Sequence, residues 1–115
     1  MPFSVVITKA GSPSVLKIQE IEMPIPKSQE VCIKVHYAGI NFADTLMRLG
    51  LYRPRPPFPF TPGYELSGVI ESLGPDVTGL EIGQRVVAAM PTGGQCSHVS
   101  AVSYTHLTLP TTLSV

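Results

Sequence analysis

EVCIKVHYA, the stretch Glu30–Ala38, decides the fold class of this chain. Its side chains alternate, with Val31, Ile33, Val35 and Tyr37 on one face and Cys32, Lys34 and His36 on the other. Because successive side chains of a β-strand point to opposite faces, this alternation predicts a strand with one face against a core. The chain is therefore expected to be built mainly from β-strands.

Short strands are also predicted on both sides of this segment. They cover Phe3–Lys9, Leu16–Met23, Glu65–Leu73, Arg85–Met90 and Gln95–Ala101. The first two flank a turn at residues 11–13, and turns are expected again at Gly83 and at residues 93–94. Gly68, inside a predicted strand, indicates a bulge or a close approach of another backbone.

One short helix is predicted to begin at Asn41 and to end about two turns later. Asn41 is a good N-cap residue, and Asp44 falls in the first turn, where its charge suits the helix dipole. Phe42, Leu46 and Leu49 form an apolar stripe at helical spacing. This helix needs tertiary packing to persist because it is so short.

Proline is unusually frequent, with 12 residues in all and a cluster in Tyr52–Gly63 (YRPRPPFPFTPG). Such a segment cannot form a helix or a central strand, so we expect an extended, polyproline-like loop over the surface. Short strands, one small helix and stiff loops together predict a mainly β fold, a small and partly open β-barrel.

Length and composition exclude several classes of protein. A chain of 115 residues has room for one domain with one core. Its 8 basic residues balance 8 acidic ones, so no nucleic-acid partner is expected. No apolar run is long enough to cross a bilayer and no secretory signal begins the chain, so no membrane partner is expected. Two cysteines give no disulfide framework, which favours a reducing, cytoplasmic location.

The end of the chain differs from the rest. No Asp, Glu, Lys or Arg follows Arg85, and Val102–Thr111 closely resemble the conceptual translation of a transposase adapter used to prepare sequencing libraries. We therefore expect a domain over residues 1–101 and an adapter-derived tail over residues 102–115, with the natural protein continuing beyond Ala101. The alternative is an ordinary strand, since Thr, Leu, Val and Tyr all favour strands.

Three long motifs point to a family: GINFADTLMRLGLY (residues 39–52), PFTPGYELSG (residues 59–68) and GQRV (residues 83–86). In combination they resemble the N-terminal domain of the medium-chain dehydrogenase/reductase superfamily. The nearest pattern is its zinc-free quinone oxidoreductase group, which includes zeta-crystallin-like and VAT-1-like proteins. The resemblance implies a GroES-like barrel followed by a Rossmann domain that binds NADPH, in a parent protein expected to be a homodimer. No G-x-G occurs in the chain, so these residues lack the usual dinucleotide loop.

Alcohol dehydrogenases of this superfamily hold a catalytic zinc ion through a cysteine and a histidine within these motifs. Here the first place reads GINF (residues 39–42) without a cysteine, and Tyr64 stands where the histidine would be. An open zinc site needs three protein ligands, so no metal is expected.

A rival set of ligands consists of two cysteines and two histidines, Cys32, His36, Cys96 and His98. Cys32 and His36 would lie about 13 Å apart on a strand, too far to share an ion, and we expect free thiols and surface histidines instead.

By the resemblance, Asn41 and Tyr52 match positions that face the nicotinamide and the substrate, and both are assigned as catalytic and cofactor-binding residues. An amide N–H and a phenol O–H are the donors that a developing oxyanion needs without zinc. The alternatives are a plain helix cap for Asn41 and packing beside the proline loop for Tyr52. Tyr64 and Phe60 are assigned to the substrate pocket, with packing in the barrel or the loop as the alternative.

Weaker candidates surround these residues. Asp44 is a candidate for orienting a donor, although compensation of the helix dipole is the simpler interpretation. Glu65 follows the family's acidic position, without a zinc ion to support. Arg48, Arg53 and Arg55 form either a positive rim for an anionic ligand or a solvated loop, and the second is the safer interpretation.

The leading hypothesis is that the parent protein transfers hydride from NADPH to a quinone or an α,β-unsaturated carbonyl, while this domain shapes the substrate side. A close variant is an enoyl reductase. The alternatives are a VAT-1-like vesicle- or membrane-associated protein, another non-catalytic binding protein, and a nonfunctional truncated product. Without a dinucleotide loop, the 115 residues alone are expected to be inactive.

Overall fold

The computed structural model describes residues 1–52 and 56–102, together with the backbone of residues 106–108. Its elements follow in the order β1 (Phe3–Ile7), η1 (Pro13–Val15), β2 (Leu16–Glu20), β3 (Glu30–Ala38), α1 (Phe42–Arg48), β4 (Glu65–Leu73), β5 (Arg85–Ala89), β6 (His98–Val102) and β7 (His106–Thr108). η1 is a single turn of 3-10 helix. Strands dominate, and α1 occupies the predicted place, so the mainly β prediction is confirmed.

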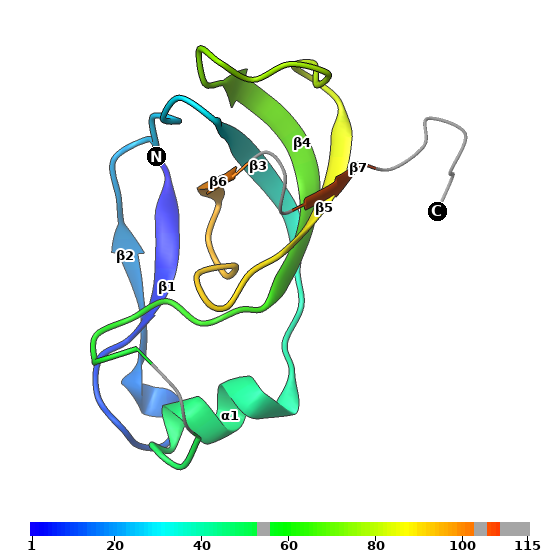
Figure 1. The fold of residues 1–115 in the computed structure, drawn as a ribbon. Coiled ribbons are helices and arrows are strands. Elements are labelled where there is room, and N and C mark those ends of the chain that lie inside the picture. Colours follow the sequence, from blue (N-terminus) through cyan, green and yellow to red (C-terminus); the bar gives the residue numbers. More distant parts are fainter. Residues whose placement is uncertain (53–55, 103–105, 109–115) are drawn as a thin grey trace.

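The strands form two antiparallel sheets (Figure 1). The larger sheet has the strand order β6-β3-β4-β5-β7 and curves strongly, while β1 and β2 form a hairpin beside it. Single bridges join β1 to other segments, from Ser4 to Cys96 and from Ile7 to Phe60. α1 lies at one end of the molecule, at the bottom of Figure 1. This arrangement is the partly open β-barrel that the sequence predicts.

β3 and β4 have the predicted bounds, but the predicted alternation in β3 is only partly right. Val31 and Ile33 are fully buried, yet Cys32 on the supposed outer face is 1% exposed. Tyr37, expected on the core face, is 79% exposed. The pairing of β3 with β4 shifts register between Cys32 and Ile33 and again between Val35 and Tyr37. A register shift of this kind breaks strict alternation, which is why the prediction for Tyr37 is wrong.

Two buried clusters hold the fold together. The sheet cluster lies within the curved sheet and contains Val31, Ile33, Leu66, Ile70, Val86, Ala88 and Ala101. The second, named here the helix cluster, contains Ile7, Val15, Met47 and Phe60. α1 is only 7 residues long, so packing on the helix cluster, rather than helix propensity, keeps it folded.

Gly68 lies where β4 passes close to the backbone of β3. A Cβ atom at this position would lie 2.1 Å from the carbonyl oxygen of Lys34, well inside any allowed contact. The prediction of a close backbone approach at this glycine is therefore confirmed. A side chain here would force the two central strands of the sheet apart.

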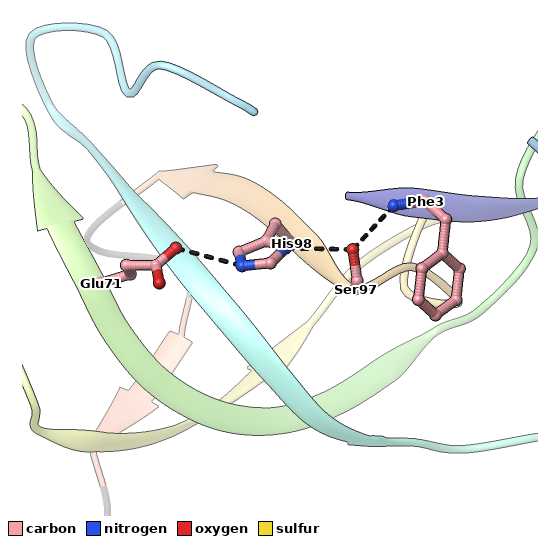
Figure 2. Close-up of polar contacts among 4 residues, drawn as sticks. All are labelled: Phe3, Glu71, Ser97 and His98. Atoms are coloured by element: carbon pink, nitrogen blue, oxygen red, sulfur yellow. Dashed lines mark hydrogen bonds and ion pairs between the residues drawn. The ribbon is translucent and has the colours of Figure 1, made fainter. Parts of the chain in front are cut away.

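The segment before β6 fastens the hairpin to the large sheet, which is why β6 begins at His98 rather than at the predicted Gln95. Ser97 N–H donates to the carbonyl oxygen of Phe3 at 2.8 Å, and Phe3 N–H donates to Ser97 Oγ at 2.8 Å. Figure 2 shows the side chains that extend this junction. Ser97 Oγ lies 3.0 Å from His98 Nδ1, and His98 Nε2 lies 3.1 Å from Glu71 Oε2. These contacts link β1, β6 and β4.

The two histidines of the rival ligand set lie in different surroundings. His36 is exposed on β3. The side chain of His98 is 14% exposed and pairs with Glu71. The prediction of a surface histidine is therefore wrong for His98, because the junction with the hairpin and β4 covers it.

The tail is described only in part. Val102 ends β6, and the backbone of His106–Thr108 pairs with β5 as β7. Residues 103–105 and 109–115 lie outside the described part of the chain. The adapter origin of residues 102–115 and the domain boundary at Ala101 therefore stay predictions. No helix in the described ranges is long and apolar enough to span a bilayer.

Replacing Ile70 by alanine tests the sheet cluster, because Ile70 is 1% exposed at its centre. We expect Ile70→Ala to lower the free energy of unfolding by about 2–5 kcal/mol, measured by urea denaturation, since it leaves a cavity. The matched control is Ile82→Ala, at a side chain that is 67% exposed, with an expected change within about 0.5 kcal/mol. Equal losses in the two variants would contradict the assignment of the core.

Candidate functional site

A buried carboxylate, Asp44, joins the start of α1 to the loop that leads into β4. Asp44 is 6% exposed. Its Oδ2 accepts the backbone N–H of Asn41 at 2.8 Å, and its Oδ1 accepts the backbone N–H of Gly63 at 3.2 Å. Asp44 therefore lies in the first turn, as predicted, but it does more than compensate the helix dipole. It fixes two distant segments of backbone to each other.

Asn41 is the N-cap residue of α1, as predicted, with extended backbone at φ −113° and ψ 161°. Its side-chain amide donates to Glu65 Oε1 at 3.3 Å, across to the first residue of β4. A carboxamide nitrogen carries two N–H groups, so one remains beyond the bond to Glu65. The helix cap and a role as a donor are therefore compatible in this geometry.

The backbone around Tyr64 is held rigidly. Tyr64 O accepts the N–H of Met90 at 2.6 Å, and the N–H of the preceding Gly63 is bound to Asp44. Gly63 has φ +117°, and a Cβ atom there would lie 2.7 Å from the backbone nitrogen of Gln95. Only glycine fits both constraints. The direction in which Tyr64 leaves the backbone is thus set by its neighbours.

Tyr52 and Tyr64 come together on the helix cluster, although 12 positions separate them in the sequence. Partial loss of hydration, the neighbouring Tyr52 and the negative charge of Asp44 all raise the pKa of Tyr64. Tyr64 therefore keeps its proton at neutral pH.

Two further predicted side chains, Phe60 and Arg48, have described contacts. Phe60 is 8% exposed within the helix cluster, and its ring centroid is 5.5 Å from that of Phe58. Its assignment to a substrate pocket stays a prediction. Arg48 donates to the carbonyl oxygen of Gly11, so it anchors the loop after β1. Residues 53–55, which include the other two arginines, are outside the described part of the chain.

An open cleft of about 440 Å³ has Glu65 in its lining. It is lined by residues 37–39, 65–67 and 87–89, at the adjoining ends of β3, β4 and β5. None of the four predicted site residues lines this cleft. The predicted donors therefore lie beside the cleft and not in it.

The rival metal ligands do not form a site among the residues that the structure covers. Cys32 and Cys96 are free thiols, and Cys96 Sγ donates to the carbonyl oxygen of Gly93 at 3.3 Å. Burial and the neighbouring charge of an ionised Cys32 raise the pKa of Cys96 to about 11. Burial and the charge of Glu71 raise the pKa of Cys32 as well. Both sulfur atoms are therefore protonated at neutral pH and are poor metal ligands.

The chain is similar to known proteins both in sequence and in fold. The alcohol dehydrogenase GroES-like domain family matches residues 27–113. Mouse quinone oxidoreductase is 40% identical over 106 residues, which cover 90% of this chain and 32% of that protein. The human synaptic vesicle membrane protein VAT-1 homolog-like protein superposes with a TM-score of 0.91 at 33% identity, over 99% of this chain and 37% of that one. Escherichia coli quinone oxidoreductase complexed with NADPH has a TM-score of 0.84 at 30% identity, over 97% of this chain and 34% of that one.

The chain belongs to the family of alcohol dehydrogenase GroES-like domains, within the medium-chain dehydrogenase/reductase superfamily. Its relatives there are quinone oxidoreductases, zeta-crystallin-like and VAT-1-like proteins, so the family prediction and the GroES-like fold are confirmed. The chain spans about a third of the length of the curated relatives that it matches.

Three contacts of this site were not predicted from the sequence. They are the bond from Gly63 N–H to Asp44, the bond from Asn41 to Glu65, and the bond from Gln95 Nε2 to the carbonyl oxygen of Gly39 at 3.4 Å. Of the two bonds to Asp44, only the local one from Asn41 N–H can be anticipated from the sequence. An N-cap residue followed three positions later by a carboxylate resembles a capping box. The long-range bonds depend on tertiary packing.

Removal of the Asp44 carboxylate is expected to leave two backbone N–H groups without their acceptor. Hydrogen bonds to a charged group are worth about 1.5–3 kcal/mol, so we expect Asp44→Ala to lower the free energy of unfolding by about 2–3 kcal/mol. Hydrogen exchange at the Gly63 amide should accelerate at the same time. The matched control is Asp76→Ala, at an exposed carboxylate bonded to Ser28, with a loss below about 1 kcal/mol. Unchanged exchange at Gly63 would contradict this role.

Slow alkylation of Cys96 is a second consequence of the geometry. A rise of the pKa from 9.0 to about 11 cuts the thiolate fraction at pH 8 about 100-fold, and the greater nucleophilicity of a more basic thiolate returns up to about tenfold. We therefore expect iodoacetamide to label Cys96 at least about tenfold more slowly than it labels the urea-unfolded chain, as measured by peptide mass spectrometry. The folded rate should rise with pH until about 11. Equal rates in the folded and unfolded chains would contradict the assignment.

Proposed function

We propose that this chain forms the substrate side of an NADPH-dependent oxidoreductase that reduces quinones or α,β-unsaturated carbonyls. The observation that carries the proposal is that buried Asp44 holds the backbone of Asn41 and of Gly63, the residue before Tyr64, while Tyr52 and Tyr64 pack on the same helix cluster. The curated relatives named quinone oxidoreductase support the class of reaction. An enoyl reductase is a variant of the same chemistry with a different acceptor.

The donors would act on the oxygen that gains charge during reduction. Addition of hydride to a quinone leaves a negative charge on oxygen, and preorganised hydrogen-bond donors lower the barrier to forming it. Asn41 offers its second amide N–H and Tyr52 its phenol O–H to this oxygen and to the nicotinamide side of the site. When bound, NADPH supplies the hydride and becomes NADP⁺, and one further proton from solvent completes the hydroquinone.

The residues present favour a mechanism without zinc. Asn41 and Tyr64 occupy the two places where zinc-dependent members hold a cysteine and a histidine, and an amide and a protonated phenol are not the ligands that zinc selects. Hydrogen bonding then replaces the Lewis acid. Asn41 and Tyr64 also fit an NADPH-dependent site. Both side chains offer hydrogen-bond donors, which can stabilise the oxygen of the substrate that accepts the hydride.

The complete protein, rather than these residues alone, would carry the activity. The chain matches about a third of its relatives' length, and it contains no G-x-G loop for the cofactor's pyrophosphate. Complexes of neighbouring quinone oxidoreductases with NADPH support that cofactor. The two free thiols are in keeping with a cytoplasmic location, and a homodimeric parent stays a prediction.

A non-catalytic role is the second candidate, and one observation favours it. The VAT-1 homolog-like structure superposes as well as the quinone oxidoreductases do, with a TM-score of 0.91. A vesicle- or membrane-associated binding protein on the same scaffold would not need the donor pair. Activity of the complete protein separates the two candidates, because a binding protein would bind NADPH or a partner without turnover.

The proposal is tested on the product of the complete coding sequence, obtained by sequencing the transcript across the codon for Ala101. We expect NADPH oxidation, followed by absorbance at 340 nm, to depend on an added quinone such as 1,4-naphthoquinone. Asn41→Ala and Tyr52→Phe should each lower kcat, up to about 100-fold, because each removes one donor from the oxyanion.

Ile25→Ala is the control, since Ile25 is 86% exposed and does not line the cleft, and its kcat should equal that of the wild type. Absence of quinone reduction by the complete protein would contradict the proposed function. Full activity in both Asn41→Ala and Tyr52→Phe would leave the reaction class standing but overturn the assignment of the donors.

A further inference from the structure

Glu65, the first residue of β4, contacts the short segment between β3 and α1 with both its backbone and its side chain. Its carbonyl oxygen accepts the N–H of Gly39 at 3.1 Å. Its Oε1 accepts the side-chain amide of Asn41 at 3.3 Å. The second contact is the one that bears on function, because it joins a carboxylate to a side chain assigned as a donor.

Gly39 leaves the space in which the Glu65 side chain lies. A Cβ atom at position 39 would lie 2.7 Å from Glu65 Cγ and 2.9 Å from Glu65 Cδ, too close for either pair. The carbonyl oxygen of Gly39 is held as well, by Gln95 Nε2 at 3.4 Å. The Glu65 side chain therefore crosses a glycine that is bonded on both sides, and this path leads to the Asn41 amide.

A carboxylate selects one of the two orientations of an asparagine amide. The Asn41 amide can turn over, which exchanges the places of its acceptor oxygen and its NH₂ group. An ionised carboxylate accepts hydrogen bonds and donates none, so it can face the NH₂ group but not the oxygen. Asn41 Nδ2 faces Glu65, in agreement with this rule. Glu65 thereby fixes which atoms Asn41 presents to the rest of the site.

We propose that Glu65 is a positioning residue that holds the Asn41 amide in the orientation that the reaction needs. Glu65 acts through Asn41, since an ionised carboxylate has no proton to donate to the substrate oxygen. Its negative charge opposes an oxyanion nearby, so its contribution is geometric rather than electrostatic. This inference rests on the proposed function, and it gives Glu65 a role that needs no zinc ion.

The contact is tested first on the 115-residue chain by NMR, without reference to activity. Two carboxylates face Asn41, Glu65 at its side-chain amide and Asp44 at its backbone N–H. We expect the ¹⁵N and ¹H signals of the Asn41 side-chain amide to move during an acid titration, because protonation of Glu65 weakens the bond that it accepts. In Glu65→Gln this movement should be largely lost, while the backbone signal of Asn41 still follows Asp44.

Gly39→Ala is a second variant, and it keeps the charge of Glu65. Its methyl group displaces the flexible Glu65 side chain from its path over residue 39. The titration of the Asn41 side-chain amide should therefore weaken in Gly39→Ala as it does in Glu65→Gln. An unchanged titration of this amide in both variants would overturn the contact.

The role is tested on the complete protein by two substitutions at position 65, with kcat/KM for quinone as the readout. A glutamine can face Asn41 with its oxygen or with its NH₂ group, so Glu65→Gln populates both orientations and should lower kcat/KM about twofold. A lysine only donates, so Glu65→Lys selects the opposite orientation and should lower kcat/KM at least about tenfold. An electrostatic role predicts the reverse order, because a positive charge beside the oxyanion would raise kcat/KM.

Glu81→Lys is the matched control for the change of charge. Glu81 is exposed in the loop between β4 and β5, whereas Glu65 lies at the opposite end of β4. Its kcat/KM should equal that of the wild type. Asn41→Ala combined with Glu65→Lys should be no slower than Asn41→Ala alone, because Glu65 acts through Asn41.

The outcomes separate the two proposals. If the wild-type complete protein reduces no quinone, the proposed function fails and this role fails with it. If the wild type is active but Glu65→Lys is as active as Glu81→Lys, or its loss multiplies with that of Asn41→Ala, only the role of Glu65 is overturned. Melting temperatures of the variants within about 2 °C of the wild type exclude unfolding as the cause of a loss.

Discussion

The pair of backbone hydrogen bonds to Asp44 is the constraint on which the site depends. A carboxylate that is 6% exposed would be costly to bury without partners, and here both oxygens accept backbone N–H groups, from Asn41 and Gly63. Oδ2 binds the N-cap residue of α1, and Oδ1 binds the loop before β4. The carboxylate binds the backbone N–H of Asn41 and that of Gly63, the residue before Tyr64. Asn41 and Tyr64 are therefore brought to the same place.

The large sheet supplies the frame for this constraint. β4 begins at Glu65, directly after Tyr64, and its pairing with β3 and β5 fixes where the anchored loop must end. The close approach at Gly68 and the buried sheet cluster leave little freedom for β4 to slide. The ends of β3 and β4 therefore fix the segments that carry Asn41 and Tyr64, while Tyr52 follows α1.

The sequence predicts the frame better than it predicts the site, for physical reasons. β3, β4 and the start of α1 follow from local alternation and capping, which depend on neighbours in the chain. Tyr37 was misplaced because a register shift is a property of two paired strands. His98 was misplaced because the hairpin junction that covers it involves Phe3, at the far end of the sequence. The meeting of Tyr52 with Tyr64 likewise requires the helix cluster, which no local pattern describes.

The central claim is that Asn41, whose backbone Asp44 holds, and Tyr52 bind the oxygen that is reduced. The most direct measurement is a crystal structure of the complete protein with NADP⁺ and a quinone. The account predicts a quinone oxygen within about 3.2 Å of both Asn41 Nδ2 and the Tyr52 hydroxyl group, as for a normal hydrogen bond. A quinone bound elsewhere, with both side chains beyond hydrogen-bonding distance from it, would contradict the account.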